Sequence, residues 1–130
     1  MPRWTFELIP GTLSRDEKDA IAKAVTEAYT EAGIPAFWVN VFFHENPVGC
    51  FYSGGQSPPN AIFFVIDHAA RGWKSEEERL RFIDRINTIV GPILRPKGIK
   101  WEYNIYEHPA HNWRINGMVP PMNHPEALAQ

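Results

Sequence analysis

The sequence predicts an α+β protein in which two βαβ units form a four-stranded, mainly parallel sheet with two helices on one face. Segments typical of strands occur in two pairs, and each pair encloses a segment with apolar residues at helical spacing. The two halves, residues 3–44 and 61–106, are similar in length and layout. A chain of 130 residues suits a single domain, which we expect to span residues 1–130.

The first unit begins with a strand over residues 3–9, where apolar and polar residues alternate. A helix follows, because Ser14 can cap its first turn and Glu17 can reach back to complete a capping box. Its apolar stripe consists of Ile21, Ala24, Val25, Ala28 and Tyr29. Residues 37–44 are rich in aromatic and β-branched side chains and are predicted to form the second strand.

The second unit begins with residues 61–67, whose nearly continuous apolar character predicts a strand buried on both faces. Ser75 and Glu78 match a second capping box, and the helix that follows carries its own apolar stripe. That stripe consists of Leu80, Ile83, Ile86, Asn87 and Val90. The Gly-Pro pair at residues 91–92 is predicted to break or end this helix, and the last strand is expected over residues 99–106.

The segments between and after the two units are predicted to be less regular. Residues 50–52 are interpreted as a short edge strand, and residues 53–60 as a loop. From residue 107 to residue 130 we expect an irregular C-terminal segment. The sheet face away from the helices carries aromatic side chains without a predicted cover, so we expect self-association.

Composition excludes several classes of partner. The net charge is −2 and Lys and Arg do not cluster, so no nucleic-acid partner is expected. The apolar segments are too short to cross a bilayer, so no membrane is expected either. Cys50 is the single cysteine, which excludes an internal disulfide framework, and His108 with His111 lacks a third metal ligand. We expect a cytoplasmic protein without a metal or a cofactor.

Pro2 is the first candidate catalytic residue. Removal of Met1, which is common before the small proline ring, would leave a free secondary amine. An α-amino group titrates at about 7.7–8.0 in reference peptides, and burial among apolar side chains lowers that pKa. The neutral amine would then be a general base, and it could also act as a nucleophile. The alternative is that Pro2 merely starts an edge strand.

Arg71 follows the buried strand at 61–67, at the carboxyl end where α/β sites tend to form. Its guanidinium could bind a substrate carboxylate with two hydrogen bonds, and Lys74 could assist as a point charge. The alternative is two solvated charges ahead of a helix. His44 and His68 are interpreted as strand-end residues with local hydrogen bonds rather than as a catalytic pair.

Several features together resemble the tautomerase superfamily, and within it a branch of the cis-3-chloroacrylic acid dehalogenase-like family. These features are the amino-terminal proline, the two βαβ units, Gly54-Gly55, Trp101-Glu102-Tyr103, Trp113-Arg114-Ile115-Asn116-Gly117 and Pro120-Pro121. The resemblance covers residues 2–121. It implies the tautomerase (MIF-like) fold and a homotrimer, with Pro2 at the bottom of a pocket near a subunit interface.

The resemblance also implies roles for individual residues. Arg71 matches the first of two carboxylate-binding arginines in the dehalogenases, and Lys74 replaces the second. Tyr103 matches a catalytic tyrosine that would position water or donate to a developing enolate oxygen. Tyr29 stands where the dehalogenases have a substrate-binding histidine. A core aromatic remains the alternative for Tyr103, and a half-buried residue at a helix end remains the alternative for Tyr29.

The C-terminal segment departs from the dehalogenase pattern. The dehalogenases have a glutamate there that activates water, and the corresponding position is most simply Ile115. No carboxylate occurs between Glu107 and Glu126, so dehalogenase activity is expected to be weak or absent. Arg114, beside this position, could bind an acidic group of the substrate or pair with a surface carboxylate.

These observations predict a proline-based tautomerase or isomerase that acts on a small enol, keto or unsaturated carboxylic acid. Pro2 would be the general base, Arg71 and Lys74 would hold the carboxylate, and Tyr103 would stabilise charge. One alternative is a hydratase or dehalogenase-type lyase on a small unsaturated acid, with Pro2 as general acid. A second is a non-catalytic trimeric binding protein of the same fold, and a third is imine chemistry at Pro2 with a carbonyl substrate.

Overall fold

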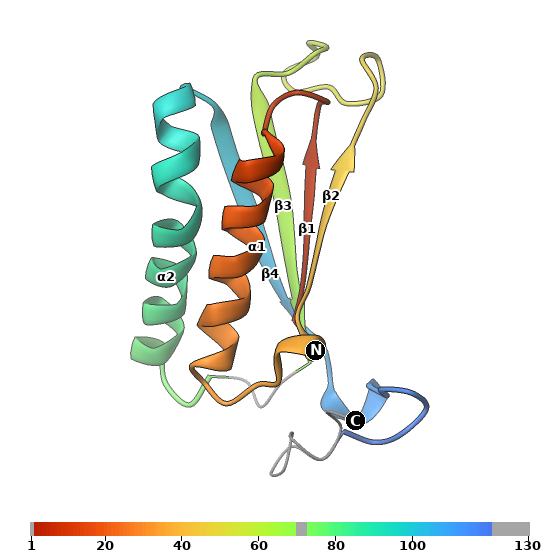
Figure 1. Cartoon of the computed structure of the whole chain (residues 1–130), viewed down its shortest axis with the longest axis vertical. Helices are drawn as coiled ribbons and strands as arrows, with labels where there is room; N and C mark the ends of the chain where they lie inside the picture. Colours follow the sequence, from red (N-terminus) through yellow and green to blue (C-terminus); the bar gives the residue numbers. More distant parts are fainter. Residues whose placement is uncertain (1, 70–72, 121–130) are drawn as a thin grey trace.

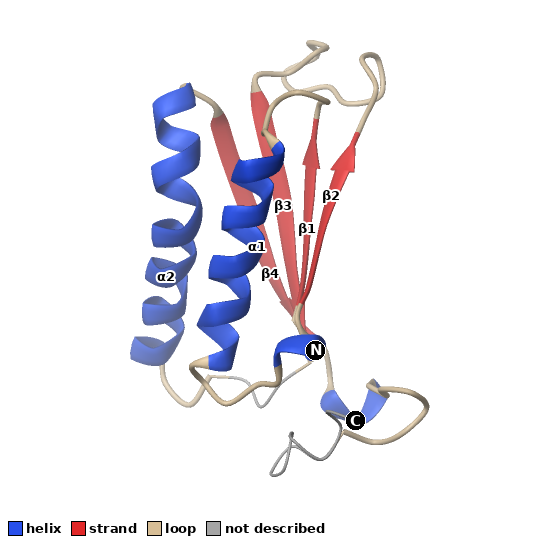
Figure 2. Ribbon diagram, in the orientation of Figure 1, coloured by secondary structure: helices blue, strands red, loops and turns tan. Residues whose placement is uncertain are grey.

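The computed structural model describes residues 2–69 and 73–120, and it contains one four-stranded sheet with two helices on one face (Figures 1 and 2). The elements are β1 (Arg3–Leu8), α1 (Arg15–Thr30), η1 (Ala36–Trp38), β2 (Asn40–Glu45), β3 (Ala61–His68), α2 (Glu76–Leu94), η2 (Arg95–Lys97), β4 (Lys100–Glu107) and η3 (Ala110–Asn112). Here η denotes a 3₁₀ turn. The predicted fold class and the predicted grouping of strands and helices are confirmed.

The strand order is β2-β1-β3-β4. Strands β1 and β2 are parallel, as are β3 and β4, because each pair is joined by a crossover helix. The two units meet at the centre, where β1 and β3 are antiparallel and Arg3 lies opposite Asp67. The sheet is therefore mainly parallel with one antiparallel seam.

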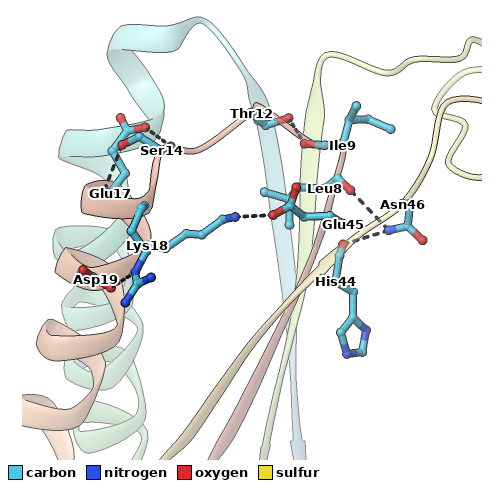
Figure 3. Close-up of polar contacts among 11 residues, drawn as sticks. Leu8, Ile9, Thr12, Ser14, Glu17, Lys18, Asp19, His44, Glu45 and Asn46 are labelled. Atoms are coloured by element: carbon cyan, nitrogen blue, oxygen red, sulfur yellow. Dashed lines mark hydrogen bonds and ion pairs between the residues drawn. The ribbon is translucent and has the colours of Figure 1, made fainter.

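Helix α1 begins as the sequence predicts. The Ser14 side chain accepts from the backbone N–H of Glu17, and the Glu17 side chain accepts from the backbone N–H of Ser14 (Figure 3). Lower on the same helix, Lys18 forms an ion pair with Glu45 at the end of β2. The cap and this ion pair hold the first turns of α1 over the β1–β2 half of the sheet.

Helix α2 differs from its prediction in two ways. Ser75 caps it by accepting from the backbone N–H of Glu78, but the Glu78 side chain accepts from the backbone N–H of Lys74, so the second capping box is only half formed. The helix also continues through Pro92 to Leu94. An interior proline costs about 3 kcal/mol, and fully burying one leucine side chain contributes roughly 1.5–3 kcal/mol. Leu94 and Val90 are both fully buried, so their packing offsets that cost.

Two strand predictions are wrong. Within residues 37–44, the first residues belong to η1 and pairing with β1 begins only at Asn40, because Trp38 is buried in a second cluster beyond the sheet. Residues 50–52 are not a strand. The backbone forms a turn just before them instead, because the Cys50 N–H donates to the Pro47 carbonyl. In this turn Gly49 has a left-handed conformation that L side chains rarely adopt.

Beyond β4, the described part of the C-terminal segment is irregular apart from η3 and a bridge between Ile115 and Met118. Strand β4 itself runs one residue into the predicted segment, to Glu107. Residues 121–130 of that segment lie outside the described residues. No helix in the described ranges has the length and apolarity that a membrane crossing needs.

The core lies between the sheet and the two helices. Its fully buried members are Trp4, Phe6, Leu8, Ile21, Val25, Ile62, Phe64, Ile66, Ile86, Val90 and Leu94. The opposite sheet face carries Phe42 and Tyr106, which are 44% and 52% exposed, as the sequence analysis expected of an uncovered aromatic face.

Replacing Leu94 with alanine tests the account of α2 beyond Pro92. We expect the free energy of unfolding to fall by about 2–5 kcal/mol, because the change leaves a cavity under the last helical turn. Leu80→Ala in the same helix is the matched control, since Leu80 is 48% exposed, and it should cost less than about 1 kcal/mol. Equal losses in urea unfolding of the two variants would contradict this account.

Candidate active site

Pro2 is buried and directly precedes β1, which begins at the end of the sheet near the amino terminus of the chain (Figure 1). Its carbonyl accepts a hydrogen bond from the backbone N–H of Asn40 at 3.0 Å, which continues the β1–β2 pairing. On the other side, the Arg3–Asp67 register places Pro2 next to His68. Strand alternation puts Pro2 on the same face as Trp4, the side toward the core. Met1, whose removal would free the amine, lies outside the described residues.

A cavity of about 220 Å³ opens at the same end of the sheet. It is lined by Phe37, Trp38, Asn40, Trp113, Arg114 and Ile115. The lining therefore comes from η1, the first residue of β2 and the C-terminal segment. The backbone N–H of Asn40, one of these lining residues, is the group that donates to the Pro2 carbonyl, so Pro2 lies one backbone hydrogen bond from the lining without being part of it.

Two tryptophans build the wall of this cavity. The rings of Trp38 and Trp113 are perpendicular, with centroids 5.0 Å apart, and both are buried together with Ala69 at the end of β3. The Trp38 indole N–H is buried and meets no hydrogen-bond acceptor in the described part of the chain. The ring pair ties the C-terminal segment to η1, so the cavity depends on residues distant in sequence.

Arg114 lines the cavity and is exposed, and its Nη1 donates to the carbonyls of Trp113 and His111 at 2.8 and 3.1 Å. It forms no ion pair with a carboxylate in residues 2–69 and 73–120. A guanidinium has five N–H donors, so the remaining ones are available to an acidic ligand. Binding of an acidic group by Arg114 stays a prediction, now with a cavity beside it.

Tyr29 and His68 form a buried polar pair beside Pro2. The indole N–H of Trp4 donates to the Tyr29 hydroxyl oxygen at 3.1 Å, and that oxygen lies 3.3 Å from His68 Nδ1. Burial raises the pKa of Tyr29, and burial lowers the pKa of His68 from 6.5 to about 4. Both groups are therefore neutral at pH 7.

His68 is the last residue of β3, in agreement with its interpretation as a strand-end residue, but its side-chain hydrogen bond is not local. Its ring contacts Trp73 and Phe82, with centroids 5.4 and 5.5 Å away, as well as Tyr29. Alternation along β3 was the available signal, because it places His68 on the same face as Phe64 and Ile66. A histidine at a core-facing position needs a polar partner, and that partner is 39 residues away in sequence.

Tyr103 is half-buried and packs against the core on edge strand β4. Its ring stacks on Phe64 with centroids 4.9 Å apart, its hydroxyl donates to Asn87 Oδ1 at 2.8 Å, and burial raises its pKa. The β3–β4 register pairs His68 with Glu107, four residues beyond Tyr103. At about 3.3 Å per residue, Tyr103 is roughly 13 Å along the strand from the level of Pro2. One protomer does not bring the two together, and the catalytic role of Tyr103 stays a prediction.

The predicted carboxylate-binding pair is only partly visible. Arg71 lies outside the described residues. Lys74 is exposed just ahead of α2, and its backbone N–H donates to Glu78 Oε2 at 2.7 Å. Its neighbour Trp73 contacts His68, which places Lys74 at the same end of the sheet as Pro2. Across the described ranges, no group of three His, Cys, Asp or Glu side chains could hold a metal ion.

A family model described as "Putative oxalocrotonate tautomerase enzyme" matches residues 1–130. The chain belongs to this family. It is thus a member of the tautomerase superfamily, as the resemblance of Pro2 and the two βαβ units implied. No curated protein matches the chain.

Several solved structures share the fold of this chain. A probable enzyme from the thermophilic fungus Aspergillus fumigatus is 44% identical, with a TM-score of 0.88 over 93% of this chain and 85% of that one. N1, a member of the cis-3-chloroacrylic acid dehalogenase family, is 19% identical, with a TM-score of 0.74 over 96% and 88%. A fused 4-OT, solved as an asymmetric trimer, is 19% identical, with a TM-score of 0.70 over 98% and 99%.

Replacing Tyr29 with phenylalanine should lower the free energy of unfolding by about 1–3 kcal/mol, because it leaves the buried Trp4 indole N–H without an acceptor. Urea unfolding measures the change. Tyr52→Phe serves as control, since Tyr52 is 59% exposed, and we expect it to change stability by less than about 0.5 kcal/mol. A Tyr29→Phe variant as stable as the wild type would refute the hydrogen bond.

Burial of neutral His68 makes stability depend on pH. Because its folded pKa, about 4, is below its ordinary 6.5, the unfolded state binds a proton that the folded state does not, and stability falls as pH drops from 6.5 to 4. A shift of this size corresponds to roughly 3 kcal/mol. The measurement is the difference in the free energy of unfolding between wild type and His68→Gln, taken at pH 7 and at pH 4. Both proteins contain the same carboxylates, so the contribution of carboxylate titration cancels in this difference. A difference that does not change with pH would contradict the assignment.

Proposed function

We propose that the protein is a proline-based tautomerase or isomerase of a small enol, keto or unsaturated carboxylic acid, with Pro2 as general base after removal of Met1. The observation that carries this proposal is the position of Pro2, which is buried and whose carbonyl is hydrogen-bonded to Asn40, a lining residue of an aromatic-walled cavity that also includes Arg114. Membership of a tautomerase family supports the same reaction class.

In the proposed mechanism the neutral amine of Pro2 takes the proton from the enol oxygen and returns a proton to carbon. Apolar surroundings favour the neutral amine, because burial disfavours the cation. Arg71 and Lys74 hold the carboxylate, as the family resemblance implies, and Arg114 offers a further cation at the cavity. Tyr103 acts in this proposal only if the assembled protein brings it to a neighbouring site, because its own protomer keeps it away from Pro2.

The cavity supports a small, planar substrate. Its walls include three aromatic rings, Phe37, Trp38 and Trp113, with one cation, Arg114, among its lining residues. An apolar cavity of about 150 Å³ holds benzene, so about 220 Å³ accommodates a ring or a short unsaturated chain with a few further atoms. An unsaturated or aryl-substituted oxo acid has this shape and charge.

The hydratase or dehalogenase alternative receives less support. Ile115, which by the family resemblance corresponds most simply to the water-activating glutamate of the dehalogenases, lines the cavity. None of the described residues lining the cavity has a carboxylate. Water attack would therefore lack a general base, whereas a proton shift needs only the amine.

The proposal includes a homotrimer in a reducing, cytoplasmic setting. Phe42 and Tyr106 are exposed on the sheet face that the helices leave open, and burying them against other copies removes apolar area from water. The fused 4-OT relative is itself a trimer. The exposed free thiol of Cys50 suits a reducing compartment.

The amine is tested on protein expressed without an N-terminal tag. We expect the intact mass to lack one methionine and the protein to catalyse ketonisation of phenylenolpyruvate. Pro2→Ala should lower kcat/KM by about 10²- to 10⁴-fold, the usual contribution of a general base. Pro10→Ala, an exposed proline in a turn, is the matched control and should leave kcat/KM unchanged.

Retention of Met1 would make the Pro2 nitrogen an amide and would end this mechanism. Equal activity of Pro2→Ala and wild type would also overturn it and would favour the binding protein. A borohydride-trapped adduct at Pro2 with a carbonyl substrate would indicate imine chemistry instead.

A further inference from the structure

His68 is a buried histidine that the proposed mechanism does not use. It is 7% exposed and lies on the core-facing side of β3, one residue beyond the last β1–β3 pair, Arg3–Asp67, where the same register continued sets it opposite Pro2. Residues directly opposite in such a pair have Cβ atoms roughly 5 Å apart. A substrate held at the Pro2 amine is therefore within reach of the His68 ring.

The hydrogen bonds around Tyr29 run in one direction. An indole N–H can only donate, so the Tyr29 oxygen accepts from Trp4 at 3.1 Å. The hydroxyl has a single hydrogen, and His68 Nδ1, 3.3 Å away, is its acceptor in the described part of the chain. If Nδ1 carried the proton, the Tyr29 hydrogen would be buried without an acceptor, which costs free energy. The satisfied arrangement has Tyr29 donate to an unprotonated Nδ1.

The direction of these hydrogen bonds, from Trp4 through Tyr29 to His68, determines which side chain still has a free N–H or O–H to donate. A neutral imidazole with an unprotonated Nδ1 carries its proton on Nε2, and burial keeps His68 neutral by lowering its pKa to about 4. Nε2 meets no acceptor among the described residues. Tyr29, by contrast, has already given its only hydrogen to His68.

We propose that His68 Nε2–H, and not the Tyr29 hydroxyl, donates a hydrogen bond to the substrate oxygen that bears negative charge while Pro2 moves the proton. This inference rests on the proposed function. A preorganised neutral donor stabilises an enolate oxygen without changing its own charge. Trp4 and Tyr29 are then positioning residues that fix the tautomer of His68, because the hydrogen bond to one ring nitrogen decides which nitrogen carries the proton.

Kinetics of three variants separate the two donors. We expect His68→Leu to lower kcat/KM for phenylenolpyruvate by about 10- to 100-fold, because a donor to a charged oxygen is lost. His68→Gln, whose amide can donate near the position of Nε2, should recover most of this loss. Tyr29→Phe should cost less than His68→Leu, since the histidine donor remains. A larger loss for Tyr29→Phe than for His68→Leu would overturn the proposal.

The tautomer can be measured without turnover, which keeps the inference testable if His68→Leu does not fold. Nitrogen-15 NMR of histidine-labelled wild type at pH 7 should show His68 as the neutral Nε2–H form. Tyr29→Phe should allow the Nδ1–H form to appear, because it removes the donor to Nδ1. An Nδ1–H or a doubly protonated His68 in the wild type would overturn the proposal.

The outcomes also distinguish this inference from the proposed function. If Pro2→Ala abolishes ketonisation while His68→Leu, folded by circular dichroism, retains full kcat/KM, only the role of His68 fails. If Pro2→Ala is fully active, the proposed function fails, and the NMR tautomer still decides whether the Trp4–Tyr29–His68 chain has the stated direction.

Discussion

The antiparallel pairing of β1 with β3 is the contact on which the rest of the structure depends. It is the sole seam between the two βαβ units within the sheet, since each unit supplies one parallel pair. Its register sets Arg3 opposite Asp67. The same register, continued by one residue, sets Pro2 beside His68. A shift of one residue would turn every side chain of β1 to the other face, taking Trp4 and Phe6 out of the core. The core and the candidate site therefore share one constraint.

A second cluster, formed by Trp38, Ala69 and Trp113, completes the site. These residues lie outside the regular strands and come from three separate parts of the chain, so no single segment could build the cavity. Their burial offsets the entropy of ordering an irregular C-terminal segment, which carries Arg114 and Ile115 to the cavity. The contact between Trp38 and Trp113, outside the sheet, thus positions Arg114 at the cavity.

The electrostatics of the site favour neutral groups around the amine. Burial keeps Tyr29 and His68 uncharged. Of the described cations at this end of the sheet, Arg3 is ion-paired with Asp67, and Lys74 and Arg114 are exposed. This division suits a reaction in which an anionic acid enters from solvent and a neutral amine transfers a proton. Ile115, which lines the cavity, adds no charge to it.

The sequence alone determined the fold class, because alternation, helical spacing and the cap at Ser14 are local signals repeated in both halves. It also pointed to Pro2, Tyr29 and Arg114, which the structure places at one end of the sheet. Local signals failed where tertiary packing opposed them. Helix α2 continues through Pro92 because Leu94 is buried. Residues 37–39 do not join the sheet because Trp38 packs against Ala69 and Trp113 instead.

Only the tertiary structure decided which side chains distant in sequence are in contact. The contact between Tyr29 and His68 joins residues 39 apart, and the direction of its hydrogen bond depends on Trp4 as well. The distance of Tyr103 from Pro2 likewise follows from strand register. Sequence spacing carries no information about such pairings, because they are set by how the two units pack and not by either unit alone.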